Sequence, residues 1–175
     1  NLIVGYFFLL RIFDEFKDSI ADAKYRPYRA VPRGLVSFFE LRILAFLIIA
    51  IQFILNLVFI PRMLVIWVFV ISFMLIMRRE FFLGIWLLKH PVFYLITHML
   101  VMPVIDFYTT GLDWRVLGAK VPCGLLIFLI VTFLNGVVIE IGRKIRSKSA
   151  EEFGVETYSF LWGEKKRQLS GFVFC

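Results

Sequence analysis

Four runs of apolar residues, each close to the length that a membrane-crossing helix requires, most constrain how this chain can fold. A helix needs about 20 apolar residues to cross ~30 Å of hydrocarbon. We expect spans at Leu35–Ile60, Met63–Met77, Pro91–Tyr108 and Val121–Ile139, and Ser37 with Glu40 gives a capping-box signature at the start of the first. No run alternates as a membrane β-barrel strand would. The sequence therefore predicts an all-α membrane protein, a multi-helix transmembrane bundle whose backbone polar groups are hydrogen-bonded internally.

Positive charge is concentrated in alternate connections between these runs. Of the 20 Lys and Arg residues, six, three and seven lie within residues 11–34, 78–90 and 140–168. Because positive loops stay on the cytoplasmic side, we expect these three segments there, at the plasma membrane if the protein is bacterial. The basic residues form no continuous face, so we expect no nucleic-acid partner.

The remaining segments complete the expected organisation. Arg78–His90 mixes charged and aromatic residues, which predicts a helix lying in the membrane interface. Gly111–Lys120 is expected to be a short loop. Both chain ends lie in or beside apolar sequence and no initiator Met is present. We therefore expect residues 1–175 to form one transmembrane domain that is incomplete at both ends.

Carboxylates recur at helical spacing just before the first complete span. Asp14, Asp18 and Asp22 are each four residues apart, so on a helix they share one face with Cβ atoms about 6 Å apart. Such a ridge is costly unless a cation lies between the carboxylates. Mg²⁺ suits it, because this ion takes oxygen ligands and shares its other positions with water and phosphate.

Arginines follow these carboxylates directly. Arg26, Arg29 and Arg33 lie in a segment where Pro27 and Pro32 should end the helix. Guanidinium groups bind phosphate oxygens bidentately. Metal-binding carboxylates beside phosphate-binding arginines predict a diphosphate site, and the alternative is a solvated charged loop between two membrane helices.

The spacing of this segment resembles the UbiA superfamily of intramembrane prenyltransferases. The family motif Asn-x-x-x-Asp-x-x-x-Asp falls on Asp14, Asp18 and Asp22, and the following Arg-Pro-x-Arg-Pro-x-Pro-x-Gly run falls on RPYRAVPRG, residues 26–34. Asp14 replaces the usual Asn and Ala30 replaces a Pro. The resemblance implies a helical bundle, of which this chain would cover the end of the family's helix 2 to the start of helix 7.

The second half of the resemblance lies after the fourth span. GVETYSFLWG, residues 154–163, resembles the family's Gly-x-x-Thr segment. The acidic pair expected before it falls on Arg146 and Ala150, which are not acidic. The nearest combination of charges is Glu140 with Arg143 and Lys144. The hypothesis is that cations replace part of a second metal site, and the alternative is that these cations are only the positive charge that flanks a membrane span on its cytoplasmic side.

The resemblance implies transfer of a polyprenyl group from its diphosphate to an aromatic or other lipophilic acceptor with Mg²⁺. The expected metal ligands are Asp14, Asp18, Asp22, Glu15 and Glu140, and the three aspartates are also the expected catalytic residues. The expected diphosphate contacts are Lys24, Arg26, Arg29, Arg33, Arg143 and Lys144. We expect the lipid bilayer as surroundings and no obligate protein partner.

Polar residues inside the apolar runs are candidates for the acceptor pocket. His98 and Asp106 are ionisable groups at membrane depth, which carry a functional presumption. Gln52 and Asn56 are four apart and should point into the bundle. The alternative for His98 and Asp106 is hydrogen bonding between helices, or a position in the membrane interface for Asp106.

Two other functions compete with the prenyltransferase. A non-catalytic or transport protein could bind a lipid diphosphate with the same segment, and the unusual second half favours it. A phosphatidyl-alcohol transferase is disfavoured, because its longer acidic signature is absent from the sequence.

Overall fold

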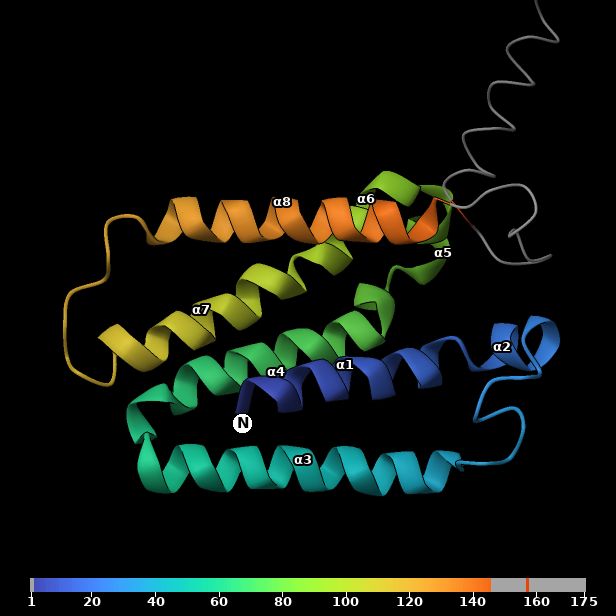
Figure 1. Ribbon diagram of the computed structural model, residues 1–175, viewed down its shortest axis with the longest axis horizontal. Coiled ribbons are helices and arrows are strands. Elements are labelled where there is room, and N and C mark those ends of the chain that lie inside the picture. Colours follow the sequence, from blue (N-terminus) through green and yellow to red (C-terminus); the bar gives the residue numbers. More distant parts are fainter. Residues whose placement is uncertain (1, 146–156, 158–175) are drawn as a thin grey trace, which may run out of the picture.

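The computed structural model describes residues 2–145 and 157, and every regular element among them is a helix (Figure 1). The elements are α1 (Leu2–Lys17), α2 (Ser19–Tyr25), α3 (Phe38–Phe59), the 3₁₀ turn η1 (Pro61–Met63), α4 (Leu64–Arg78), the 3₁₀ turn η2 (Glu80–Phe82), α5 (Gly84–Lys89), α6 (Pro91–Met99), α7 (Val101–Trp114) and α8 (Leu125–Lys144).

Within the described residues, four helical stretches are long and apolar enough to cross a membrane. They are Phe38–Phe59, Pro61–Arg78, Pro91–Trp114 and Leu125–Lys144. Their outer faces expose large apolar side chains, such as Phe46 at 70 %. Exposed apolar faces suit a lipid surrounding, where burial of apolar area is not what holds helices together. The prediction of an all-α protein with membrane-spanning helices is confirmed to this extent.

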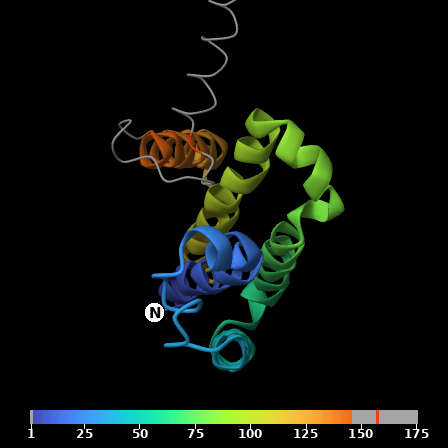
Figure 2. The same cartoon turned by 90° about the vertical axis from the view of Figure 1, so that its right-hand side faces the viewer.

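Helix α1 lies at the centre of the packed core. Its buried residues Tyr6, Leu9, Ile12 and Phe13 recur at helical spacing. They pack with buried residues of α4 and α7, and α1 also contacts α3. Seen from the right-hand side of Figure 1, α1 is flanked by these helices while α8 lies beside α7 (Figure 2). The core therefore fixes α1 relative to α4 and α7.

The start of α3 forms as its sequence predicts. Ser37 caps the helix by accepting a hydrogen bond from the Glu40 backbone N–H at 3.2 Å, and the Glu40 carboxylate accepts from the Ser37 backbone N–H at 2.7 Å. The preceding helix α2 ends at Tyr25, before Pro27. Both predicted boundaries are confirmed.

Gln52 and Asn56 point into the bundle, as expected. Asn56 is fully buried; its side-chain amide donates to the Gln52 carbonyl at 2.8 Å and its Oδ1 accepts from the Tyr108 hydroxyl at 2.8 Å. Gln52 donates to the carbonyl of Leu2 at 2.9 Å. These bonds connect α3 to α1 and α7, so both side chains link helices.

The third span differs from its prediction at two places. It continues to Trp114, so the expected loop at Gly111 is wrong. Gly111 is buried against Met63, and a Cβ there would lie 2.8 Å from the Met63 Cε atom, so this glycine permits close helix packing. One turn at Leu100 also separates α6 from α7 within this span, where Pro103 has no N–H for the carbonyl of Met99, although Leu100 itself keeps helical φ and ψ angles.

Two further boundaries are corrected. The predicted interfacial helix over residues 78–90 is instead η2 and the short α5, because Glu80, Phe81 and Phe82 have φ between 51° and 58°. Helix α8 begins at Leu125, after Gly124, and continues to Lys144. Glu140, Arg143 and Lys144 therefore lie on the last turns of a helix and not in a loop.

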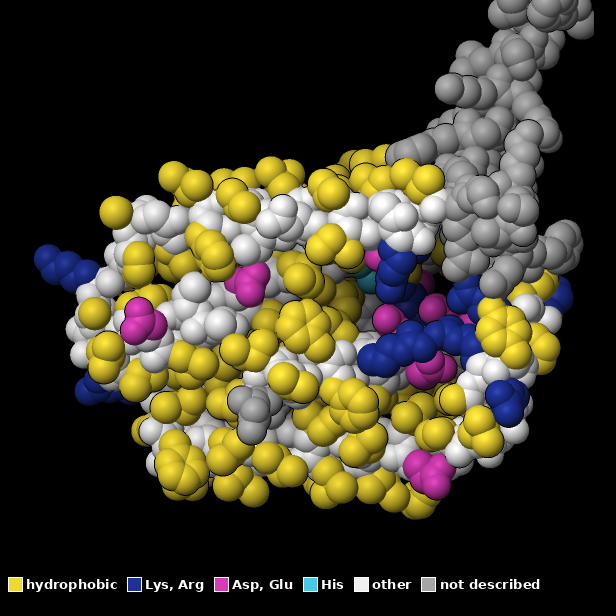
Figure 3. Space-filling view, in the orientation of Figure 1, with side chains coloured by type: hydrophobic (Ala, Val, Ile, Leu, Met, Phe, Trp, Pro, Cys, Tyr) yellow, Lys and Arg dark blue, Asp and Glu magenta, His cyan; other side chains and the backbone are white. Residues whose placement is uncertain are grey.

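The described parts of the three basic segments, residues 11–34, 78–90 and 140–145, meet at one end of the bundle, which we call the charged end. Helices α1, α4 and α8 end there, and α3 and α6 begin there (Figure 1). Charged side chains gather at this end around a hollow, while apolar side chains cover most of the remaining visible face (Figure 3). The expected cytoplasmic position of these segments stays a prediction.

Candidate functional site

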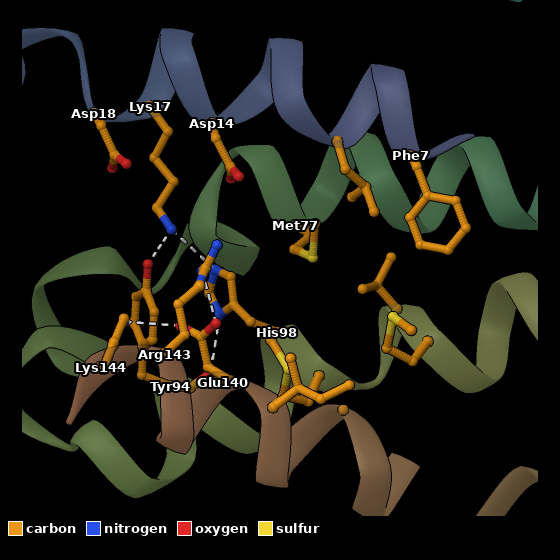
Figure 4. A pocket seen from close by; sticks show the side chains of 16 residues that line it. Phe7, Asp14, Lys17, Asp18, Met77, Tyr94, His98, Glu140, Arg143 and Lys144 are labelled. Carbon is orange, nitrogen blue, oxygen red and sulfur yellow. Dashed lines mark hydrogen bonds and ion pairs between the residues drawn. The ribbon is translucent and has the colours of Figure 1, made fainter. Parts of the chain in front are cut away.

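A cavity of about 470 Å³ lies between α1 and α8 at the charged end. Its polar lining residues are Asp14, Lys17, Asp18, Tyr94, His98, Glu140, Arg143 and Lys144. Its other lining residues are Phe7, Leu10, Met77, Met99, Val101, Met102, Gly136 and Ile139. In Figure 4 the labelled charged groups lie together, and Met77 and Phe7 lie to one side of them. The cavity is thus divided into a charged end and an apolar end.

The aspartate ridge forms with helical backbone bonds but is divided by a bend. The N–H groups of Asp18, Asp22 and Arg26 donate to carbonyls four residues earlier at 2.8–2.9 Å. Asp18 itself lies between α1 and α2 with φ −85° and ψ 4°. Asp14 and Asp18 line the cavity and Asp22 does not. The structure therefore brings two of the three predicted carboxylates to the site.

Asp14 is held in a setting that opposes its ionisation. Burial raises the pKa of the Asp14 carboxyl above its ordinary value; Lys17 opposes this effect and Asp18 adds to it. Among described residues, neither Asp14 nor Asp18 has an ammonium or guanidinium nitrogen within 4.0 Å. A cation entering the cavity would stabilise both carboxylates.

Asp22 is instead joined to the arginine segment. Its side chain is buried and forms an ion pair with Arg29, and Arg26 lies 3.6 Å away. Arg29 also contacts Glu15 at 3.2 Å, and Glu15 binds Arg11 at 2.6 Å. These pairs hold the segment after α2 against α1. Asp22, Glu15 and Arg29 are therefore engaged with one another outside the cavity lining.

Lys17 is a site residue that the sequence prediction missed. Its ammonium group donates to the Tyr94 hydroxyl and lies 3.3 Å from His98 Nε2 (Figure 4). The same group lies 3.8 Å from a Glu80 carboxylate oxygen. Lys17 follows Asp14 by three residues and so shares its helix face. That spacing was the available signal, but the residue lies outside the family motif.

His98 is fixed in one tautomer by its neighbours. Its Nδ1 lies 2.9 Å from the Tyr94 carbonyl, which can only accept, so Nδ1 carries the hydrogen. Nε2 is then the acceptor for Lys17. The ring stacks on Tyr94 with centroids 4.0 Å apart and meets the edge of Phe81 at 6.0 Å. Positive φ angles at residues 80–82 turn Phe81 into this contact.

Helix α8 supplies the opposite wall. The Glu140 carboxylate accepts from Arg143 at 2.7 Å and lies 3.1 Å from the Lys144 ammonium group. Glu140 is mostly buried, whereas Arg143 is largely exposed. The three residues that the sequence prediction placed together are indeed together, at one end of the cavity.

Other predicted residues lie elsewhere. Asp106, Gln52 and Asn56 do not line the cavity, and Lys24 and Arg33 are exposed. Of the segment 154–163, only Thr157 is described, and it is buried. The rest of that predicted second motif lies outside the described residues.

The donor set fits a hard divalent cation in part. No group of three or more His, Cys, Asp or Glu side chains within residues 2–145 and 157 forms a ready metal cage. Mg²⁺ commonly needs only one or two carboxylates, since water and substrate phosphate fill its other positions. Asp14 and Asp18 meet that requirement. Glu15, Asp22 and Glu140 are already paired with cations.

Comparisons with known proteins add no family assignment. A scan against protein-family models finds no match, and searches of curated proteins and of solved structures find no significant match. Function is therefore argued from the site.

Proposed function

We propose that this protein is a membrane prenyltransferase of the UbiA type that transfers a polyprenyl group from its diphosphate to an aromatic or other lipophilic acceptor with Mg²⁺. The observation that carries the proposal is the divided cavity, with Asp14 and Asp18 at its charged end and apolar side chains at the other. An amphiphile with an anionic head and an apolar tail matches that division.

The charged end would hold the diphosphate. Asp14 on α1 and Asp18 just after it would hold Mg²⁺, and Arg143 and Lys144 on α8 would contact phosphate oxygens. A bound Mg²⁺ would neutralise the charge that grows on the departing diphosphate. Lys17 can donate to the same oxygens, because its ammonium group faces the cavity.

The apolar end would hold the prenyl tail and exclude water from the reacting carbon. Phe7, Leu10 and Met102 line this end. The face of an aromatic ring such as Phe7 stabilises positive charge, which develops on the allylic carbon as its bond to oxygen breaks. The positively charged segments suggest that this charged end faces the cytoplasm.

The acceptor would lie beside His98. Nε2 carries the one free lone pair of the imidazole, which Lys17 approaches at 3.3 Å. Once Lys17 turns to the diphosphate, Nε2 can take the proton that an acceptor releases when the new bond forms. Lys17 orients Nε2 in the structure. Asp106 lies outside the cavity lining and is assigned no role in this proposal.

The test is prenyl transfer in membranes that contain the full-length protein. We expect a new prenylated lipid and Mg²⁺-dependent pyrophosphate release, with Asp14→Asn and Asp18→Asn each lowering the rate about 100-fold or more, the scale of losing one transition-state charge contact. Asp113→Asn is the control, because this exposed residue lies near the opposite end of the bundle. Wild-type activity in both variants would reject the proposal.

A non-catalytic protein that binds a lipid diphosphate is the second candidate. Three cations, Lys17, Arg143 and Lys144, line the same end as the carboxylates, so an anion can be bound without chemistry. Binding of farnesyl diphosphate without prenylated product or pyrophosphate release would favour this candidate.

A further inference from the structure

Three basic side chains from two helices converge on the charged end of the cavity. Lys17 extends from α1, and Arg143 and Lys144 extend from α8 on the other side (Figure 4). Lys17 is already bonded to Tyr94 and close to His98 and Glu80. The two α8 cations share one partner, Glu140.

The two carboxylate oxygens of Glu140 each face one of these α8 cations. One carboxylate oxygen, Oε2, accepts from Arg143 at 2.7 Å, and the other, Oε1, lies 3.1 Å from Lys144. The Glu140 side chain is 11 % exposed, whereas Arg143 is 69 % exposed. The carboxylate is therefore the fixed inner member of the cluster, and the guanidinium group is the outer member that can reorient.

Two anionic oxygens that face two cations are also what one phosphate group would present. We propose that Glu140 is an internal counter-ion that holds Arg143 and Lys144 until a diphosphate takes its place, so that these cations and Lys17 form an anion site that needs no metal. The inference rests on the proposed function for the choice of a diphosphate as ligand. In this role Glu140 lowers the affinity for diphosphate, whereas a metal ligand would raise it.

The charges around the cavity explain why Glu140 would lower the affinity for phosphate. With Glu140 present, an arriving phosphate must compete for bonds that a carboxylate already makes, and Asp14 and Asp18 on the facing wall repel it further. Without the Glu140 charge, the two cations remain on the last turn of α8, and no carboxylate of that helix competes with phosphate for them. A metal ligand behaves differently, because its removal weakens diphosphate binding only when Mg²⁺ is present.

The experiment measures binding to the purified full-length protein in detergent, first with EDTA and then with Mg²⁺. Inorganic pyrophosphate and farnesyl diphosphate are titrated separately, which distinguishes a free anion from a lipid-borne one. In EDTA, Glu140→Gln should bind both about tenfold more tightly, the scale of one charge-assisted hydrogen bond. Glu140→Ala serves as a second variant in case the amide side chain disturbs folding.

Two kinds of control complete the design. Asp113→Asn removes the same charge near the opposite end of the bundle and should leave both affinities unchanged. Arg143→Gln and Lys17→Met should each weaken binding in EDTA about tenfold. Thermal unfolding without ligand confirms that each variant is folded.

The outcomes separate the two proposals. Unchanged or weaker binding in both Glu140 variants, or no binding by wild type in EDTA, would overturn the counter-ion role. A loss of affinity confined to Mg²⁺ would assign Glu140 to the metal instead. Tighter binding without any transferase activity would support this inference while rejecting the catalytic function.

Discussion

Replacing Asp22 by Asn should destabilise the charged end of the bundle even when no metal is present. Asp22 is buried and bridges Arg29 and Arg26, which belong to the segment after α2. Asn keeps the size of the side chain but removes its charge. Arg29 would then be left with Glu15 at 3.2 Å as its remaining acidic partner among the described residues.

The magnitude follows from burial. Breaking a fully buried ion pair costs about 3–5 kcal/mol, and an exposed pair contributes at most about 1 kcal/mol. The Asp22 side chain is 4 % exposed and that of Arg29 is 18 % exposed. Since Glu15 retains part of the interaction, we expect a loss of about 2 kcal/mol in the free energy of unfolding.

The assay is reversible unfolding of the full-length protein in detergent with EDTA. Asp18→Asn is the matched control, because Asp18 has no ion pair with a described cation, and it should leave stability nearly unchanged. A double-mutant cycle with Arg29→Gln should give a coupling close to the loss itself. If Asp22→Asn unfolds like wild type in EDTA but loses Mg²⁺-dependent activity, Asp22 is a metal ligand and the reasoning fails.

Three further outcomes can be measured by thermal unfolding. Burial raises the pKa of Asp14, so its charged form destabilises the fold above that pKa. Asp14→Asn should therefore be more stable than wild type at pH 7. The difference should vanish as the pH falls below the ordinary pKa of 3.8, where the carboxyl is protonated in the folded and unfolded states. Asn56→Ala leaves the buried Tyr108 hydroxyl without its acceptor and should cost about 1–3 kcal/mol, of which Tyr108→Phe in the same chain should recover a part. Gly136→Ala should destabilise because its Cβ would lie 2.9 Å from a neighbouring side chain, whereas Gly142→Ala, which meets nothing within 4 Å, should be neutral or stabilising by up to about 1 kcal/mol.

The length of each apolar run predicted the spanning helices, because this property is local in the sequence. The cap at Ser37 and the end of α2 before Pro27 were likewise predicted, since each depends on a few adjacent residues. Gly111 was misjudged because a glycine in a loop and a glycine at a helix crossing look alike in sequence. The contact with Met63, 48 positions away, decides between them.

The site was predicted only where it depends on residues that are close in sequence. Helical spacing placed Asp14 and Asp18 together, but it could not show that the chain bends at Asp18 and turns Asp22 towards Arg29. Lys17 was missed because its partners Tyr94 and His98 lie about 80 residues later. Long-range contacts of this kind are not encoded in any local pattern.

One turn at Leu100 divides the third span into α6 and α7, yet Leu100 keeps helical φ and ψ angles of −59° and −17°. The first part, α6, carries Tyr94 and His98 to the charged end of the cavity, and the second part, α7, carries Met102 to its apolar end. The backbone N–H groups of Leu100 and Val104 both donate to carbonyls four residues earlier, so the helical path continues across the turn. A substitution that rotated this span would therefore move side chains at both ends of the cavity together.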